Sequence, residues 1–158
     1  MKKYELTDET IEVYGTALHR IKALKDFGNV KKGELGGYVE SEHNLSQEGN
    51  CWVCGNAEVY DNAEVYDNAK VYGKARVCDN AKVCGNADYI TIKGLGSKYR
   101  NTTIFRTKEN IAVKCGCFYG TLAEFVDKVK ETHGNSKFAK EYLALIDLVK
   151  IHFELEDK

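Results

Sequence analysis

Residues 53–87 read VCGNAE VYDNAE VYDNAK VYGKAR VCDNAK VCGNA, and this stretch decides the fold. Six hexapeptides repeat in one phase, with valine at the first position and alanine at the fifth. Successive side chains of a β-strand point to opposite faces, so this repeat places each alanine and the next valine on one face and the charged residue between them on the other. The pattern therefore predicts short strands and not helices.

The third and fourth positions of each repeat hold Asp or Gly followed by Asn or Lys, and they are predicted to be turns. Asp, Asn and Gly adopt left-handed backbone conformations at low cost. Such repeats indicate a parallel β-helix in which three hexapeptides form one triangular coil. Each residue then stacks on the residue 18 positions later, about 4.8 Å away.

The 18-residue register can be checked against the charges. It predicts three outward pairs of opposite charge, namely Glu58 with Arg76, Glu64 with Lys82 and Lys70 with Asp88. Each such pair contributes about 0.2–1 kcal/mol, which helps to fix the register but does not hold the fold together. The register also stacks Asp61 on Asp79, where a metal ion and a solvated turn are the two interpretations. We expect the solvated turn.

The region before the regular repeats is predicted to begin the same domain. Residues 1–35 form an N-terminal β cap with a hairpin about Gly15. Residues 36–92 form the hexapeptide-repeat region, and its first coil is degenerate. In that coil Val39 and Leu45 lie six positions apart, and a two-residue slip follows before the regular repeats begin.

Residues 93–158 are predicted to form a C-terminal cap continuous with the repeats. A β-hairpin is expected within residues 102–115. Residues 121–124, TLAE, form a capping box that begins a helix, and Gly134 ends it. A final helix follows from Ser136, with an apolar stripe that we expect to pack on the sheet or on a neighbouring subunit.

Composition limits the functional classes. The 158 residues are 30% charged and 43% hydrophobic, with a formal net charge of −1, which excludes a disordered acidic tail and a basic nucleic-acid coat. No apolar run approaches the roughly 20 residues that span a bilayer, and the N-terminus lacks a secretory signal. We therefore expect a cytoplasmic protein with no membrane partner, in which the six cysteines are reduced thiols.

The cysteines do not indicate a metal or redox centre. Cys54, Cys78 and Cys84 occupy the repeat position that holds tyrosine in the other repeats. Residues 51–54 have the CxxC spacing but are predicted to lie on a strand, where no helix terminus lowers a thiol pKa. Residues 115–117 have the wrong spacing for a zinc site, and no histidine follows at a suitable interval. We predict no metal site.

Basic residues are concentrated in residues 89–120, which contain six lysines and arginines and one acidic residue, Glu109. Residues 93–100, KGLGSKYR, leave a strand through two glycines and then offer a hydroxyl, two cations and an aromatic ring. Such a turn can direct backbone N–H groups and cations at an anion, although a solvated basic face would give the same pattern. The predicted ligand-binding residues are Ser97, Lys98, Tyr99, Arg100, Thr103, Phe105 and Arg106.

The roles expected in this site follow from side-chain chemistry. Arg100 or Arg106 would bind phosphate, and Tyr99 or Phe105 would stack on a base. The hydroxyls of the segment would donate further hydrogen bonds. The ligand class is thus a small anion of nucleotide type, and binding of nucleic acid itself is not expected.

GGYVE at 36–40, EGNCWV at 48–53, the VYDNA repeats and a tail of the form GxGS, TTIFR, VKCGCFYGTLAEF, THG and AKEYL together resemble uncharacterised proteins of tailed phages and prophages. The resemblance covers nearly the whole chain and implies a bacterial host cell. The tail matches at Gly96, Ser97, Thr102, Thr103, Phe105, Cys115, Gly116, Cys117, Phe118, Gly120, Thr121 and His133. Relatives tend to have arginine directly after the serine, whereas here Lys98 and Tyr99 precede Arg100.

The repeats are also similar to the hexapeptide-repeat superfamily, which includes acyltransferases. That similarity implies a left-handed β-helix and assembly as a homotrimer. An acyltransferase of this type uses a histidine as general base, and the six regular repeats contain none. His43, in the degenerate coil, is the one candidate base near the repeats, and a polar residue in an exposed turn is its alternative interpretation.

The sequence therefore predicts a mainly β fold, a short left-handed parallel β-helix with a β-hairpin N-terminal cap and a C-terminal cap of a β-hairpin and two helices. The favoured function is non-enzymatic capture of a small phosphate-bearing ligand by a homo-oligomer, without a cofactor. The phage resemblance suggests sequestration of a bacterial immune signalling nucleotide. An acyltransferase with an acyl-coenzyme A donor is the second hypothesis, and a structural assembly protein is the third.

Overall fold

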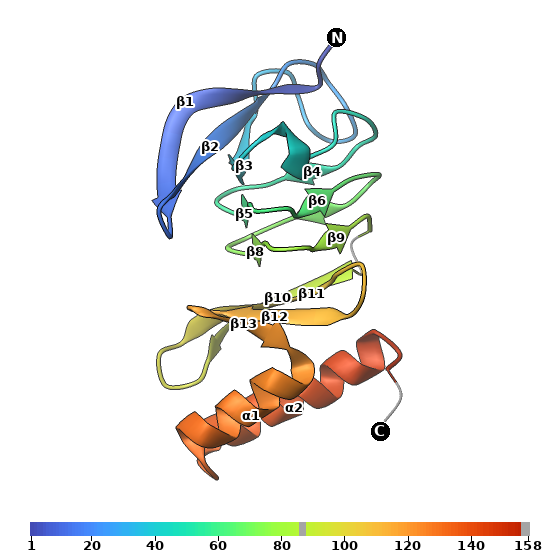
Figure 1. Ribbon diagram of the computed structural model, residues 1–158. Coiled ribbons are helices and arrows are strands. Elements are labelled where there is room, and N and C mark those ends of the chain that lie inside the picture. The colour runs from blue at the N-terminus through green and yellow to red at the C-terminus, as the bar shows by residue number, and fades with distance from the viewer. Residues whose placement is uncertain (86–87, 156–158) are drawn as a thin grey trace.

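The computed structural model describes residues 1–85 and 88–155, and its elements follow one another along one axis (Figure 1). A β-hairpin lies at the N-terminal end, a stack of short strands follows, and a four-stranded sheet and two helices lie at the other end. The predicted mainly β fold with two C-terminal helices is confirmed. Within the described ranges, no helix combines the length and the apolar character needed to cross a membrane.

The N-terminal cap is the predicted hairpin. Strands β1 (Tyr4–Val13) and β2 (Thr16–Ala23) pair antiparallel. Tyr14 and Gly15 join them with φ angles of 49° and 83°, which is the left-handed turn that the glycine indicated. Strand β3 (Leu35–Val39) pairs antiparallel with β2 and begins the stack on its other edge.

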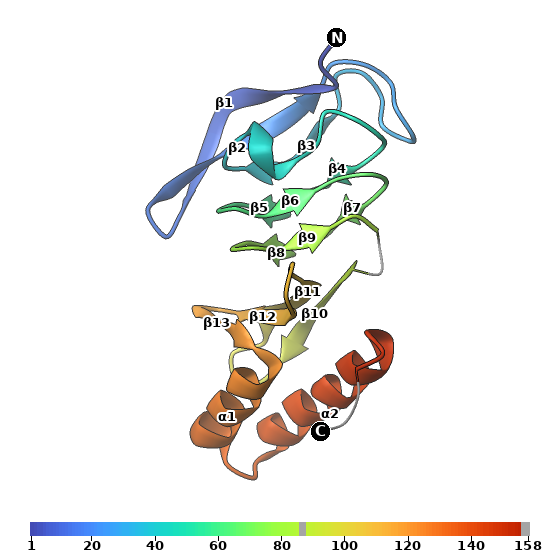
Figure 2. The ribbon, with the colours of Figure 1, turned by 45° about the vertical axis from the view of Figure 1, so that its right-hand side comes forward.

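Two-residue strands make up the stack (Figures 1 and 2). They are β4 (Trp52–Val53), β5 (Glu58–Val59), β6 (Glu64–Val65), β7 (Lys70–Val71), β8 (Arg76–Val77) and β9 (Lys82–Val83). They pair parallel in three columns, β3-β5-β8, β6-β9 and β4-β7. Val59 pairs with Val77 and Val65 with Val83, so the 18-residue register is confirmed.

The first coil contains the predicted two-residue slip. Leu45 bridges to Val65, 20 positions later, whereas Trp52 pairs with Lys70, 18 positions later. The 3-10 turn η1 (Glu42–Asn44) precedes the slip, and its Asn44 amide donates to two carbonyl groups of the next coil at 3.1 and 2.9 Å. Together with the Leu45–Val65 bridge, these hydrogen bonds join this corner of the first coil to the next coil.

The inward positions of the repeats form one continuous apolar core. No valine or alanine of this set exposes more than 1% of its surface; its members are Val53, Ala57, Val59, Ala63, Val65, Ala69, Val71, Ala75, Val77, Ala81 and Val83. Burial of one such valine stabilises the fold by about 1.5–3 kcal/mol, so the stacked coils are held mainly by this column. Ala87, which the repeat also assigns to this core, lies outside the described residues.

Two of the three predicted charge pairs form. Arg76 Nε lies 3.4 Å from Glu58 Oε2, and Lys82 forms an ion pair with Glu64. The third prediction differs from the structure, because Asp88 lies beyond the last stack strand and pairs with Arg106 at 3.2 Å. The chain has left the coil register by that point.

The C-terminal sheet lies between the stack and the helices. Its strands are β10 (Tyr89–Leu95), β11 (Arg100–Arg106), β12 (Ile111–Cys115) and β13 (Phe118–Thr121), antiparallel in that order. The predicted hairpin is the β11 and β12 pair. Figure 2 shows the sheet between the stack and the helices. Phe105 and Ala112 join the core of the stack, whereas Ile104 and Val113 join the core of the helices, so the sheet separates two apolar clusters.

Both helices begin where the sequence predicts, and the first also ends at the predicted glycine. Helix α1 (Leu122–His133) begins at the Thr121 capping box and ends at Gly134, whose φ is 57°. Ser136 caps helix α2 (Lys137–His152), and its hydroxyl accepts a hydrogen bond from the Ala139 backbone. The apolar stripe of α2 packs against the sheet and α1. The sheet is one of the two partners expected for this stripe, and a neighbouring subunit is the other.

Candidate functional site

A cavity of about 250 Å³ lies beside the sheet, where the loop after β10, the turn between β12 and β13, and both helices meet. We call it the C-terminal cavity. It is lined by Ser97, Lys98, Arg100, Cys115, Cys117, Phe118, Phe125, Lys128, Val129, Thr132, His133 and Tyr142.

The loop at one edge of the cavity is fixed against α2. Gly96 has a φ of 79°, and a side chain there would collide with the ring and hydroxyl of Tyr142. The Tyr142 hydroxyl donates to the Leu95 carbonyl at 3.2 Å, and the Gly96 backbone donates to Glu141 at 3.3 Å. Glycine at 96 therefore sets the position of Ser97 at the cavity edge.

The opposite edge depends on a second glycine. Gly116 has a φ of 59° in the turn between β12 and β13, and the Arg100 side chain lies directly over it. A Cβ at this position would collide with the guanidinium nitrogen. The CGC segment at 115–117 thus provides a left-handed turn and a flat surface for Arg100.

The wall of the cavity is aromatic. Phe125 contacts Phe118 and Tyr142, each with ring centroids 5.4 Å apart, and the His133 ring stacks on Tyr142 at 5.8 Å. Burial, followed by the neighbouring Cys115 thiol, raises the pKa of Tyr142 to about 12. Its hydroxyl is therefore a neutral donor at physiological pH. All six cysteines lie within the described residues and are free thiols.

The charged side chains among the described residues that line the cavity are basic. Lys98, Arg100 and Lys128 line it, and no aspartate or glutamate is among the described residues that do. Lys128 lies 3.9 Å from Glu131, a contact between exposed side chains that contributes little. A cavity with cations at its rim and rings in its wall suits an anion that carries a planar group.

The predicted site residues divide between this cavity and other places. Ser97, Lys98 and Arg100 line it. Tyr99 is 67% exposed with a φ of 53° and is not among the lining residues.

Two predicted residues lie on the opposite side of the sheet. The Thr103 hydroxyl accepts a hydrogen bond from the Arg76 backbone at 3.2 Å. Phe105 is fully buried in the core of the stack and stacks on Tyr119 at 6.3 Å. Alternation along β11 accounts for this, because odd-numbered residues of this strand face the stack.

Arg106 lies at the far end of β11. Its guanidinium pairs with Asp88 at 3.2 Å and lies 5.2 Å from the centroid of the Phe153 ring. These contacts fasten the end of α2 to the sheet, so the structure places Arg106 in a joint between elements and not in the C-terminal cavity.

Sequence reasoning missed the residues that the helices bring to the cavity. Helix α1 contributes two pairs of residues at i, i+4 spacing, Phe125 with Val129 and Lys128 with Thr132. Helix α2 contributes Tyr142. The apolar stripes were visible in the sequence, but only the packing of α1 on α2 turns them toward a common space.

A second cleft, of about 420 Å³, follows one corner of the stack. It is lined by His43, Asn62, Asn80, Lys82, Thr107, Lys108, Glu109, Asn110 and Tyr119. His43 Nε2 lies 3.7 Å from Glu64 Oε1, and Glu64 also pairs with Lys82. The His43 side chain is 55% exposed, so it is open to solvent at the edge of this corner cleft.

Comparison with known proteins gives one partial similarity. No family model matches the chain. Over 61 residues the chain is 39% identical to the uncharacterized acetyltransferase YdcK of Escherichia coli strain K12. The match covers 34% of this chain and 19% of that protein, so the chain spans about a fifth of the length of this curated relative.

Proposed function

We propose that the protein binds a small phosphate-bearing ligand with a planar ring in the C-terminal cavity, without converting it. The observation that carries this proposal is the convergence of Lys98, Arg100 and Lys128 from three separate elements on one aromatic-walled space. A solvated basic face would leave these cations dispersed. Their arrangement around a single cavity favours a ligand instead.

The charge at the rim accounts for the anionic part of the ligand. Arg100 presents a planar donor pair that suits phosphate oxygens, and its position over Gly116 limits the orientations it can take. Ser97 and Thr132 add uncharged hydroxyl donors, whereas the Tyr142 hydroxyl donates to the Leu95 carbonyl. A phosphate held in this way needs no metal ion.

The wall accounts for the planar part. Phe118, Phe125 and Tyr142 offer ring edges and faces, and His133 adds a fourth ring stacked on Tyr142. Stacking of one base on an aromatic side chain contributes about 1–3 kcal/mol. A volume of about 250 Å³ suits one ring and its phosphate and leaves the rest of a larger molecule outside.

The stack supports this function as a scaffold. We infer that its three columns and 18-residue register form a left-handed β-helix that associates as a homotrimer, which would present three C-terminal cavities. Sequestration of a nucleotide signal would follow from tight binding without turnover.

The decisive experiment is mass spectrometry of small molecules that the purified protein captures from a nucleotide-rich extract, read after heat release. We expect an unaltered phosphate-bearing compound at one per chain. Arg100→Ala should weaken its binding by about 1–3 kcal/mol, and Lys93→Ala, an exposed basic control outside the cavity, should not. Equal effects in both variants would contradict the assignment of the site.

Acyl transfer is the second candidate, and two observations favour it. The partial similarity to YdcK, a protein described as an acetyltransferase, is one. The other is the corner cleft, where Glu64 lies beside His43 and would orient its imidazole as a general base toward an acceptor amine or hydroxyl. Lys82 and Lys108 would then receive the phosphates of an acyl-coenzyme A.

This second candidate is tested separately. Release of free coenzyme A from acetyl-coenzyme A, measured across a panel of amines and sugars, should be abolished by His43→Ala and retained by His152→Ala. Activity that survives His43→Ala would exclude the corner cleft as its source. A captured ligand that returns acylated would replace the binding proposal with this one.

A further inference from the structure

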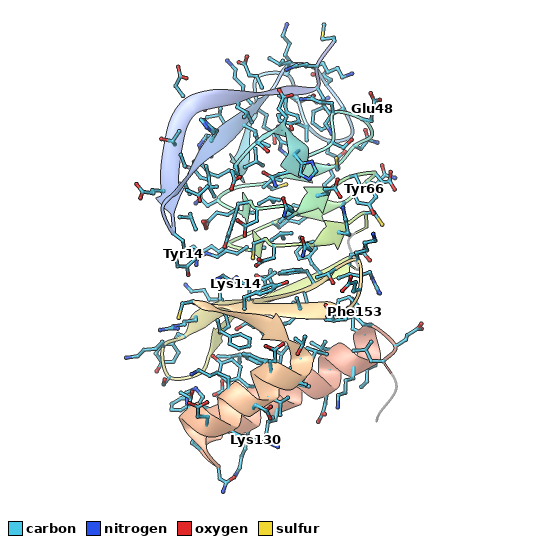
Figure 3. All side chains as sticks on the ribbon, in the orientation of Figure 1. Tyr14, Glu48, Tyr66, Lys114, Lys130 and Phe153 are labelled. Atoms are coloured by element: carbon cyan, nitrogen blue, oxygen red, sulfur yellow. The ribbon has the colours of Figure 1, made fainter. Side chains whose placement is uncertain are left out.

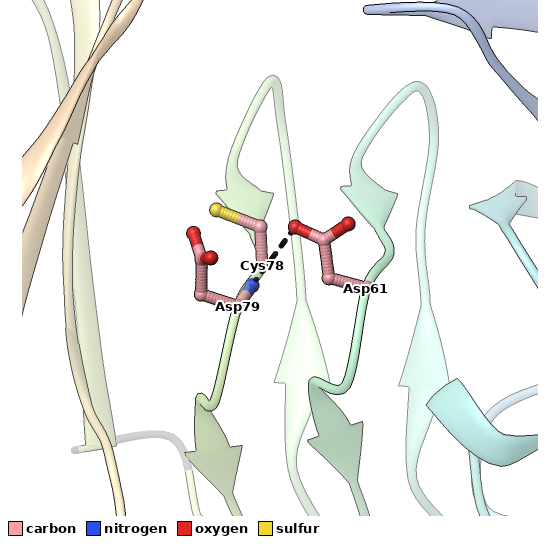
Figure 4. A group of neighbouring side chains, drawn as sticks. All are labelled: Asp61, Cys78 and Asp79. Carbon is pink, nitrogen blue, oxygen red and sulfur yellow. Dashed lines mark hydrogen bonds between the residues drawn. The ribbon is translucent and has the colours of Figure 1, made fainter.

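Two turns of the stack carry aspartates one above the other. Asp61 and Asp79 both adopt left-handed backbone conformations, with φ angles of 58° and 53°, and the Asp79 backbone donates to Asp61 Oδ2 at 3.3 Å. The register predicts this stacking. It does not predict the third member of the group, the thiol of Cys78, which lies beside both carboxylates (Figure 4).

The three ligand atoms are close enough to share one ion. One carboxylate oxygen of Asp61, one of Asp79 and the sulfur of Cys78 all lie within 4.8 Å of one another. Cys78 is 1% exposed and Asp61 is exposed, so the group has a buried sulfur side and an open oxygen side. Stacked like charges repel, and a cation between them would remove that repulsion.

A neighbouring hydroxyl supplies an independent observation. Tyr60 is 5% exposed, and its hydroxyl has no hydrogen-bond partner among the described residues. Tyr60 lies one coil above Cys78 in the same column, and its hydroxyl adjoins the thiol. A buried hydroxyl without a partner costs about 1–3 kcal/mol, which a bound ion or its water ligand would recover.

We propose that Cys78, Asp61 and Asp79 bind a divalent metal ion of the zinc type, with the Tyr60 hydroxyl next to the sulfur ligand. A thiolate with carboxylate oxygens favours zinc or cobalt over calcium and magnesium, which take oxygen ligands alone. As the metal–sulfur bond forms, the Cys78 thiol gives its proton to solvent. The ammonium of Lys114 is a positive charge near this group, and it lies over the Tyr14 ring, 4.7 Å from the ring centroid.

This site is separate from the C-terminal cavity and from the chemistry proposed there. It lies on the stack, where the ion would tie two successive coils together. We therefore expect a structural ion that raises stability without changing ligand capture.

Cobalt(II) added to chelator-treated protein is the probe. Thiolate coordination should give a sulfur-to-cobalt charge-transfer band in the near ultraviolet at one ion per chain, and zinc should displace it. Cys78→Ser should abolish the band, and Asp79→Asn should weaken cobalt binding roughly tenfold or more. Asp67→Asn and Cys54→Ser are matched controls, because each replaces the same repeat position without a stacked acid, and both should retain the band.

Each outcome decides the proposal. Cobalt binding without the charge-transfer band, or a band that persists in Cys78→Ser, would overturn the assigned ligands, as would the absence of binding. Cys78→Ser could fail to fold because the thiol is buried. Asp79→Asn keeps the size and turn preference of the side chain, so its affinity and the zinc-dependent rise in melting temperature give a second test.

Discussion

Tyr14 and Gly116 lie far apart in the sequence, yet the Tyr14 hydroxyl donates a hydrogen bond to the Gly116 carbonyl at 2.9 Å. The tip of the N-terminal hairpin thereby contacts the turn on which Arg100 lies. Figure 3 shows Tyr14 close to Lys114, whose ammonium lies 4.7 Å from the centroid of the Tyr14 ring. The hairpin spans the length of the stack and joins the two caps directly.

Tyr14→Phe tests this contact. The variant keeps the ring and removes the hydrogen bond to Gly116 and a longer one, 3.5 Å, that the hydroxyl accepts from Arg76. Because Tyr14 is 62% exposed, we expect the free energy of unfolding to fall by only about 0.5 kcal/mol. Urea denaturation measures the difference. Tyr72→Phe is the control, since Tyr72 is also exposed but lies on the stack, and an equal loss in both variants would contradict a specific role for Tyr14.

Gly116→Ala should impair the C-terminal cavity. The substitution puts a Cβ at a left-handed φ and against the Arg100 guanidinium, so it should cost about 1–2 kcal/mol of stability and displace Arg100. Titration of the captured ligand should then show weaker binding. Gly134→Ala carries a similar φ in open space, so it should lose stability alone. Unchanged affinity in Gly116→Ala would contradict a contact between Arg100 and the ligand.

Arg106→Ala should behave differently from Arg100→Ala. Arg106 pairs with Asp88 and lies over the Phe153 ring, so its loss should lower the free energy of unfolding by about 1 kcal/mol. Ligand affinity should not change, because Arg106 does not line the cavity. Denaturation and ligand titration on the same preparation separate the two effects. A loss of affinity without a loss of stability would contradict this account and indicate that Arg106 contacts the ligand.

Lys3 predicts a dependence of stability on alkaline pH. Burial lowers the pKa of its ammonium below the ordinary 10.5, although the adjacent Cys51 opposes the shift. Between the lowered pKa and 10.5 the unfolded chain holds a proton that the folded protein has released, so stability due to this group rises with pH in that window. Urea denaturation over a pH series should give a steeper rise for the natural protein than for Lys3→Met.

The reason for this pH dependence is the cage around Lys3. Its ammonium donates to the Cys51 carbonyl at 2.9 Å and lies 3.3 Å from the Cys51 sulfur, with no carboxylate among its described hydrogen-bond partners. Such a group is desolvated without a full countercharge. Parallel pH profiles for Lys3→Met and the natural chain would contradict this account.

The sequence was sufficient for the stack because the repeat is local and strictly periodic. Each valine and alanine needed only its place in the hexapeptide to be assigned to the core. The slip before Trp52 was visible as a break in that period. Asp88 was assigned to Lys70 only because the register was extended beyond its last strand, into a segment whose partner is decided by β11.

The candidate site was harder to predict, because it depends on packing between elements. Ser97, Lys98 and Arg100 share a segment with Thr103 and Phe105, but strand alternation sends the latter two to the opposite side of the sheet. A more careful use of the period of two would have separated them. Lys128 and Tyr142 could be assigned only once the crossing of the two helices was known.

The 18-residue register has a consequence for how such a chain can change in length. The described strands of the stack pair with strands one coil away, and the sheet of β10 to β13 closes the stack through hydrogen bonds to the coil next to it, such as those to the Arg76 backbone and the Lys74 carbonyl. In-register duplication or deletion of 18 residues would therefore move the two ends apart or together by about 4.8 Å and leave the composition of the C-terminal cavity intact. The hairpin of β1 and β2 is the part that would limit such growth, since Tyr14 reaches Gly116 only across a stack of the present height.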